Sequence, residues 1–439
     1  MASVAGDVTV QAGGTLRGHG TVGGNVSNIG GDVMPGGSVG ILTVAGNYVQ
    51  DANGTLALEI TPDPTAGTGY SQLLVGGTAS LDGTLAINVD PGTYLSNTSY
   101  DLVHATGGIN GTFATTTINP AFAAYLTSTV SYGGNDVTLK LAPNALAYAS
   151  GFPNYASSVS LGVEQTFDAV LGRVGPASEG RQGAWGQYLA SWGGMGASSR
   201  YSLQGGAAGT GLSVSDRLVL GVAVSGGTTT TTLSPMQVRA KPLGAFVYGI
   251  WREGGLRLAG SFGTGRLKER SRRFLSGVGA IQEASSNGHY AGFAVRGDYT
   301  AKLGAVQLSP YAGFDYMNAR YGASQEQGLP LLALHYGKIS QHLTHYQAGL
   351  RLSGSGSTWQ PWVQAGMEGW GGDRSISVTE TLGDYLKQVT SSPLPGSALS
   401  AGAGVNWHVG GWDTTLSWHG AWGSNYHGNS GMLQARYRW

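Results

Sequence analysis

The sequence has no cysteine among its 439 residues, which excludes disulfide bonds and thiolate metal sites. Charged residues are scarce, at 11 % of the chain against about 25 % in typical globular domains. The formal net charge of zero gives no indication of nucleic-acid binding. No window holds the ~18 consecutive apolar residues that a membrane helix requires. Such a chain can span a bilayer only as a closed β-barrel.

Tryptophan and the basic residues are unevenly distributed. All 11 tryptophans lie from Trp185 onward, and only Arg17 and Lys140 among the 24 Lys and Arg residues precede Arg173. This contrast predicts two chemically different parts, residues 1–142 and 184–439, joined by a linker at 143–183. Residues 1–4 have neither the basic nor the apolar segment of a signal peptide, so we expect the natural N-terminus to lie further upstream.

The first part carries a repeated turn-and-strand motif. It occurs as Asn53-Gly54-Thr55-Leu56-Ala57, Asp82-Gly83-Thr84-Leu85-Ala86 and Asn110-Gly111-Thr112-Phe113-Ala114. Asn-Gly and Asp-Gly favour turns because they tolerate positive φ, and a period of ~20–50 residues is typical of stacked units. The pattern predicts a right-handed parallel β-helix or its capping sandwich.

The second part alternates between apolar and polar residues over about twelve segments, an even number, as membrane barrels require. One segment has apolar residues at Val306, Leu308, Phe314 and Tyr316 and polar residues between them at Gln307, Ser309 and Asp315. Another has one face with Ala291, Phe293 and Val295 and the other face with Gly292, Ala294 and Arg296. A soluble sandwich would turn the apolar face inward. Aromatic residues at the segment ends favour a membrane barrel with that face toward lipid.

Connections between the segments predict two different ends of the barrel. Short turns are expected near residues 215–216, 252–255, 302–304, 353–357 and 409–411. Longer polar links are expected near 233–238, 271–284, 323–331, 378–394 and 425–430. Short turns at one end and long loops at the other are typical of outer-membrane barrels.

The linker contains a predicted helix of ~20 residues, about 30 Å long. Asn154 is its expected N-cap, and the helix is expected to end near Gly172. An apolar stripe is formed by Val159, Val163, Phe167, Val170 and Leu171, with Glu164, Gln165 and Asp168 among the polar positions. From these residues alone, a surface helix between domains remains an alternative to a helix inside the barrel.

The runs at residues 18–26 and 35–48 resemble the end of the passenger in autotransporters (type Va secretion), and the resemblance covers nearly the whole chain. It implies an autochaperone region, a lumen helix and a 12-stranded translocator barrel in the Gram-negative outer membrane. The lumen-helix residues would be Asn154, Val163, Glu164, Phe167 and Asp168. The function implied is delivery and display of the passenger on the extracellular side. A surface adhesin or autoaggregation factor, and a passive porin-like channel, remain alternatives.

The last strand resembles the C-terminal signature of outer-membrane proteins. Leu433, Ala435, Tyr437 and Trp439 share one face, while Gln434, Arg436 and Arg438 share the other. The resemblance implies a barrel-insertion signal at Leu433, Tyr437 and Trp439. The implied partners are outer-membrane lipid, the barrel-assembly machinery and periplasmic chaperones, with a monomeric barrel and no nucleic acid.

Catalytic and metal motifs are weak. Gly36-Gly37-Ser38-Val39-Gly40 matches a G-x-S-x-G string but lacks the strand-to-helix context of a nucleophile elbow. His342 and His345 should lie on opposite strand faces, which argues against a shared metal. The asparagine pair of self-cleaving autotransporters is absent, since Asn144 and Asn154 each follow proline. We expect no enzyme activity, no metal, no cofactor and no autocleavage inside the barrel.

One basic cluster has two interpretations. It shares a strand face with Leu258 and Phe262 and comprises Arg266, Lys268, Arg270 and Arg272. In the simpler one, the four residues lie where the strand leads into a solvent-exposed loop, and a bulge shifts the strand register. The alternative is a collar above the membrane that contacts lipopolysaccharide phosphates.

Overall fold

The computed structural model describes residues 2–122, 125–144, 152–171, 183–196, 198–275, 279–356 and 358–438. The chain divides into two compact units, Met1–Tyr148 with Gly383–Tyr385, and Ala149–Leu382 with Leu386–Trp439. Among the described residues, no helix combines the length and the hydrophobicity needed to cross a bilayer.

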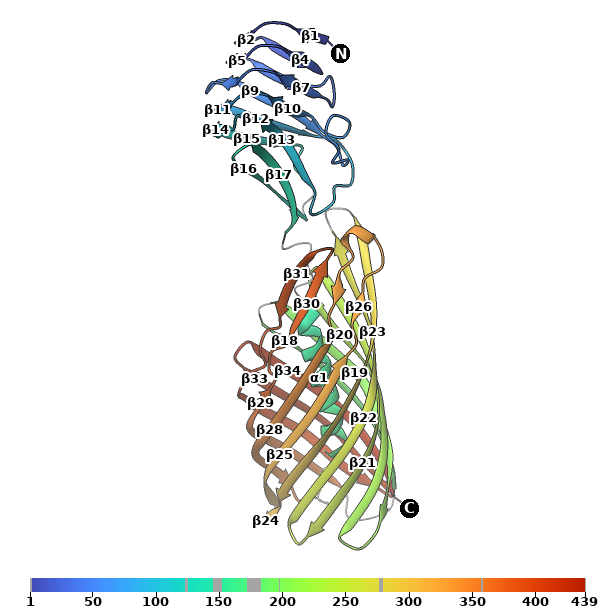
Figure 1. Ribbon diagram of the computed structural model, residues 1–439. Coiled ribbons are helices and arrows are strands. Elements are labelled where there is room, and N and C mark those ends of the chain that lie inside the picture. The colour runs from blue at the N-terminus through green and yellow to red at the C-terminus, as the bar shows by residue number, and fades with distance from the viewer. Residues whose placement is uncertain are drawn as a thin grey trace. The chain divides into compact units, whose positions relative to one another are not determined.

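Three parallel sheets form the first unit (Figure 1), and successive strands of each sheet lie three apart in the chain. The first sheet contains β1 (Ala2–Val4), β4 (Gly20–Val22), β7 (Ile41–Val44), β10 (Gln72–Val75) and β13 (Ser99–Ala105). The second contains β2 (Val8–Gln11), β5 (Val26–Ile29), β8 (Tyr48–Gln50), β11 (Ala79–Leu81) and β14 (Ile109–Gly111). The third contains β3 (Thr15–Gly18), β6 (Asp32–Pro35), β9 (Thr55–Ile60), β12 (Thr84–Val89) and β15 (Thr115–Asn119). The chain thus coils through the sheets in turn, as in a parallel β-helix.

An antiparallel pair, β16 (Leu126–Tyr132) and β17 (Asp136–Pro143), extends the first sheet beyond β13. This pair follows the last coil. The first sheet therefore ends in an antiparallel extension.

Two copies of the repeated motif stack as predicted, with Thr55 opposite Thr84 and Leu56 opposite Leu85. The third copy does not, because Thr84 lies opposite Thr115. Its Gly111, at φ 78°, belongs to β14 in the neighbouring sheet. The last coil is therefore longer than the repeat suggested.

Side-chain oxygens of Asp and Asn residues link successive coils at one corner. The backbone N–H of Asn25 donates to Asp7 Oδ1 at 2.7 Å, and that of Asn47 donates to Asn25 Oδ1 at 2.8 Å. The N–H of Thr78 donates in turn to Asn47 Oδ1 at 2.8 Å. Each coil thus satisfies a corner N–H of the next, which would otherwise have no acceptor.

Twelve long antiparallel strands form the wall of the second unit: β18 (Gly183–Met195), β19 (Ser199–Ser213), β20 (Leu218–Leu233), β21 (Met236–Glu253), β22 (Leu256–Leu275), β23 (Ala280–Tyr299), β25 (Val306–Tyr321), β28 (Ile339–Gly354), β29 (Trp359–Gly372), β32 (Ala398–Val409), β33 (Trp412–Gly423) and β34 (Tyr426–Arg438). The short β24 (Ala301–Leu303) lies at the end of β23 and pairs with β25. Pairing of β18 with β34, from Gly183–Arg438 to Met195–Tyr426, closes the barrel. The predicted twelve-stranded barrel is confirmed.

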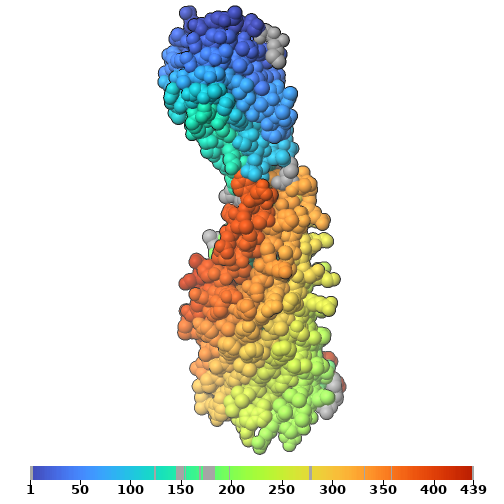
Figure 2. Space-filling view, viewed as in Figure 1, coloured from blue at the N-terminus to red at the C-terminus, as the bar shows by residue number. Residues whose placement is uncertain are grey.

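The barrel wall has its apolar face outward, as predicted. Leu433 and Tyr437 are 49 % and 43 % exposed, whereas Gln434 between them is buried. Asp315 is 3 % exposed, and its neighbour Phe314 is 38 % exposed on the outer face. Figure 2 shows this outer surface, with the side chains of β22 to β28 in yellow to orange. Trp439 lies outside the described residues.

Several loop predictions are wrong. Strands β20 and β21 are separated only by residues 234–235, and β33 and β34 only by 424–425. Most of 271–284 belongs to β22 and β23. The extended connections are 322–338 and 373–397, which contribute β26 (Ser324–Gln325), β27 (His335–Tyr336), β30 (Ser377–Leu382) and β31 (Tyr385–Thr390) to a small sheet, together with the 3-10 helix η2 (Pro330–Leu332).

Candidate functional site

The α-helix of the described residues, α1 (Phe152–Leu171), lies in the barrel lumen (Figure 1). Its described side chains are buried on several faces, including Tyr155, Ser157, Ser158 and Ser160, all at 0 % exposure. A helix buried all round lies inside a protein rather than on its surface. The alternative of a surface helix is therefore wrong.

The start of α1 differs from the prediction. The helix begins at Phe152, so Asn154 is its third residue and not its N-cap. Pro153 is tolerated in this first turn because its missing N–H would have no acceptor within the helix. The side chains of Asn154 and Asp168 lie outside the described part of the chain.

Small residues bring α1 close to the wall. A Cβ at Gly162 would lie 2.3 Å from Leu203 Cδ1 of β19. Ser160 Oγ donates to Gln341 Oε1 of β28 at 2.5 Å, and Ser158 bonds to Thr231 of β20. Phe167 packs edge-to-face on Phe246, with ring centroids 5.0 Å apart. These contacts fill the space between the helix and several strands.

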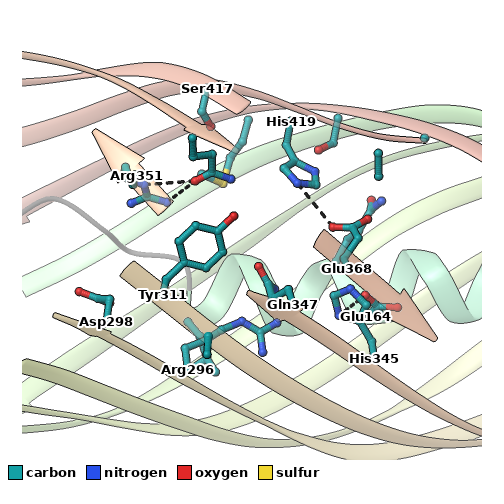
Figure 3. A pocket seen from close by; sticks show the side chains of 18 of the residues that line it. Glu164, Arg296, Asp298, Tyr311, His345, Gln347, Arg351, Glu368, Ser417 and His419 are labelled. Atoms are coloured by element: carbon teal, nitrogen blue, oxygen red, sulfur yellow. Dashed lines mark hydrogen bonds and ion pairs between the residues drawn. The ribbon is translucent and has the colours of Figure 1, made fainter. Parts of the chain in front are cut away.

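Glu164 connects the middle of α1 to a charged cluster on the wall (Figure 3). Its carboxylate lies 2.8 Å from His345 Nδ1 and accepts a hydrogen bond from Trp370 Nε1 at 2.9 Å. His345 Nδ1 also lies 2.9 Å from Asp315, which Arg296 holds through two bonds of 2.7 and 2.8 Å. Glu164, Asp315, His345 and Trp370 are buried and Arg296 is partly buried, so their attraction is screened less than at a surface.

The C-terminus of α1 has its own anchor. Arg257 Nη2 donates to the carbonyl oxygen of Leu171 at 2.5 Å, and Arg257 Nη1 lies 2.7 Å from Asp298. A cation at this end stabilises the last carbonyls of a helix and complements its dipole.

These contacts fix the direction of α1 in the barrel. Tyr155, near its start, packs on Tyr321, the last residue of β25 before the loop at 322–338. Leu171, at its end, meets Arg257, the second residue of β22 after a short turn. The start of α1 therefore lies at the end of the barrel that carries the long loops.

A cavity of about 220 Å³ remains beside α1. Its lining includes Glu164, Arg296, Tyr311, His345, Arg351 and Glu368. His419 Nε2 lies 3.5 Å from Glu368 across it (Figure 3).

Glu164, Asp315 and His345 lie close enough to share a metal ion. However, His345 already bonds to both carboxylates, and Arg296 neutralises Asp315. A nearby guanidinium disfavours a second cation. The ion-pair network accounts for these residues without a metal.

Sequence reasoning missed the wall side of this network. The prediction that His342 and His345 face opposite ways is confirmed, because His342 is exposed and His345 is 3 % exposed. The pairing of His345 with the predicted helix residue Glu164 was not anticipated. The alternation along their strands places Arg296 and Asp315 on the inward face. Their contact could not be predicted in this way, because it depends on the register between the two strands.

The Arg266–Arg272 cluster faces outward on β22, and all four of its basic residues are exposed. The bulge in the simpler interpretation is absent, since the pairing of β22 with β21 and with β23 is continuous in register.

Known proteins share this architecture. The translocator domain of autotransporter NalP from Neisseria meningitidis is similar over 66 % of this chain and 100 % of that domain, at 18 % identity and a TM-score of 0.56. The β domain of the Bordetella autotransporter BrkA matches over 59 % of this chain and 100 % of its own, at 18 % identity and a TM-score of 0.46; the shared fold rests on the first comparison. No curated protein matches the chain.

The autotransporter β-domain family model matches residues 184–419, more than half of the 439 residues. The match covers most of the barrel wall that encloses α1. The chain therefore belongs to the autotransporter family, and its barrel is an outer-membrane translocator that displays a passenger.

Proposed function

We propose that residues 2–142 are the membrane-proximal part of the passenger, held on the extracellular side by α1. The direction of α1 carries this proposal, because the start of the helix lies at the long-loop end. In outer-membrane barrels the long loops face outside and the short turns face the periplasm.

The parallel coils suit an autochaperone that folds first and supports later coils. Leu56, Leu58 and Ile60 are fully buried against neighbouring coils, and each added coil buries further apolar surface. A chain that has folded outside must lose this burial to return through the lumen. Folding thus favours outward movement without ATP.

Insertion of the barrel is proposed to use β34 as the element read by the barrel-assembly machinery, after escort by periplasmic chaperones. Leu433 and Tyr437 support this role, because both present apolar groups on the outer face of the last strand. The described part of the chain is proposed to act without catalysis. Ser38 of the G-x-S-x-G string lies between β6 and β7, strands of two different sheets, and the next described element after it is a strand and not a helix.

Single cysteines test the orientation cleanly because the chain has none of its own. Ala52→Cys lies at an exposed position in the coils, and Lys302→Cys lies at an exposed position beside a short turn. A membrane-impermeant maleimide should label Ala52→Cys on intact cells and Lys302→Cys only after the outer membrane is permeabilised. The reverse pattern would show that the passenger faces the periplasm.

A further inference from the structure

Strand β22 is longer than a membrane crossing requires. It has 20 residues, whereas a tilted membrane strand needs ~9–11. On its outer face, Leu256 to Thr264 advances about 27 Å along the strand at ~3.4 Å per residue, or about 21 Å along the membrane normal at a tilt of ~40°. This nearly matches the apolar band of ~25 Å. Arg266, the next outward residue, therefore lies at the edge of the band.

A basic patch begins at this edge. It comprises six exposed residues on two paired strands: Arg239 and Lys241 of β21, and Arg266, Lys268, Arg270 and Arg272 of β22. The six make up a quarter of the 24 Lys and Arg residues in the chain. Exposed His289 of β23 and Arg320 of β25 continue the row, with His289 directly opposite both Arg266 and Arg320.

Within this patch, like charges face each other across strands. Lys241 lies directly opposite Lys268, and Arg239 lies opposite Arg270. Like charges in such pairs destabilise a sheet unless an anion lies between them.

The strands offer little neutralising charge of their own. Residues 226–243 and 264–289 contain only two acids, Glu269 and Glu283. Glu269 is 6 % exposed on the inner face and binds Ser286, whereas Glu283 pairs with Arg272 at 2.8 Å. The remaining basic residues of the patch can be neutralised by an external anion.

We propose that this basic patch binds the phosphorylated headgroup of a lipopolysaccharide-type glycolipid in the outer leaflet. The patch continues directly into apolar side chains on the same face, including Leu243 at 64 % and Phe262 at 55 % exposure. An acyl chain can lie along this apolar surface while phosphates contact Arg266 and Lys268. The arrangement matches an anionic amphiphile better than a free anion. The inference rests on the proposed orientation, which places the patch in the outer leaflet.

The test compares two triple variants of the full chain in non-ionic detergent. The patch variant is Arg266→Ser, Lys268→Ser and Arg270→Ser, which leaves the Arg272–Glu283 pair intact. The control variant removes the same charge beside the short turns, through Arg217→Ser, Arg252→Ser and Lys302→Ser. Binding of fluorescent diphosphoryl lipid A is measured, with dephosphorylated lipid A and inorganic phosphate as competitors. Heat modifiability on gels verifies that each barrel is folded.

We expect about 100-fold weaker binding by the patch variant, at roughly a fivefold loss per basic residue, and no change in the control. Arginine-to-lysine replacement at Arg266 and Arg270 should retain most of the binding. The proposal is overturned if the folded patch variant binds within threefold of the wild type, or if dephosphorylated lipid competes equally. Displacement by millimolar inorganic phosphate would also overturn it, because it would indicate a simple anion site.

Orientation is tested separately with Ser285→Cys, at an exposed position opposite Arg270. Labelling of intact cells places the patch outside. Labelling only after permeabilisation would refute the proposed orientation, whereas loss of lipid A binding by the patch variant would still identify the binding residues.

Discussion

Replacing Glu164 by alanine should release α1 from the barrel wall. Glu164 is 6 % exposed and bonds to His345 Nδ1 at 2.8 Å and to Trp370 Nε1 at 2.9 Å. A hydrogen bond involving a charged group contributes about 1.5–3 kcal/mol. His345 keeps Asp315 at 2.9 Å, which offsets part of the loss. We therefore expect a cost of about 3 kcal/mol, which raises the undocked population of the helix ~100-fold.

The assay measures the undocked population through the labelling rate of one cysteine, introduced at a buried position of α1. Ser157 on α1 is 0 % exposed, and its hydroxyl has no hydrogen-bond partner among the described residues. Ser157→Cys is therefore a mild change in a chain without other cysteines. When opening and closing are fast relative to labelling, the maleimide reaction rate follows the open population. Glu164→Ala should increase that rate by ~100-fold in detergent-solubilised barrel.

Two matched variants separate charge from packing. Glu164→Gln keeps a hydrogen-bond acceptor but loses the charge, so its rate should rise about tenfold, at roughly half the cost of alanine. Gln165→Ala changes the adjacent residue, which is half-buried, and should stay within twofold of the parent. A Glu164→Ala rate within twofold of the parent, in a barrel that remains heat-modifiable, would refute the argument that this contact holds the helix.

Three further predictions concern packing, the helix end and insertion. Gly162→Ala should cost about 1–3 kcal/mol, because the new Cβ would lie 2.3 Å from Leu203 Cδ1; thermal unfolding should show the loss, and an added Leu203→Ala should recover part of it. Arg257→Met should cost about 3–5 kcal/mol, because it leaves Asp298, whose side chain is only 14 % exposed, without its cation. A second change, Asp298→Asn, should restore some of the unfolding temperature if the unpaired charge is responsible. Trp439→Ala should lower the amount of heat-modifiable barrel in the membrane several-fold, and wild-type amounts would count against an insertion signal at the terminal aromatic residue.

The barrel wall could be predicted from the sequence because its alternation has a physical cause along each strand. Outward positions such as Phe314 and Tyr437 must contact lipid, whereas inward positions such as Asp315 and Gln434 face the polar lumen. That contrast repeats every second residue, so the inward and outward faces of each strand can be predicted from its own sequence. The strand number and the direction of the apolar face followed from this local pattern.

Strand ends could not be predicted by the same rule. Residues 266–273 of β22 alternate between an exposed basic row and a buried row that includes Glu269, Ser271 and Arg273. Above the lipid both faces can be polar, so the apolar contrast disappears although the hydrogen-bonded ladder continues. Polar strand and polar loop then have the same composition. This explains why 271–284 resembled a long link.

The lumen network shows a different limit. Glu164, Asp315 and His345 are 151 and 30 residues apart in succession, and each has an ordinary local context. Their encounter depends on the register of β25 with β28, which places Asp315 opposite His345, and on the depth of α1 in the barrel. A shift of one residue in either strand would turn one of these side chains toward lipid. Register is set by the sum of the apolar contacts along the whole wall. The polar network therefore depends on the apolar outer face of the barrel. Substitutions of outward residues that shift the strand register should release α1 as effectively as removing Glu164.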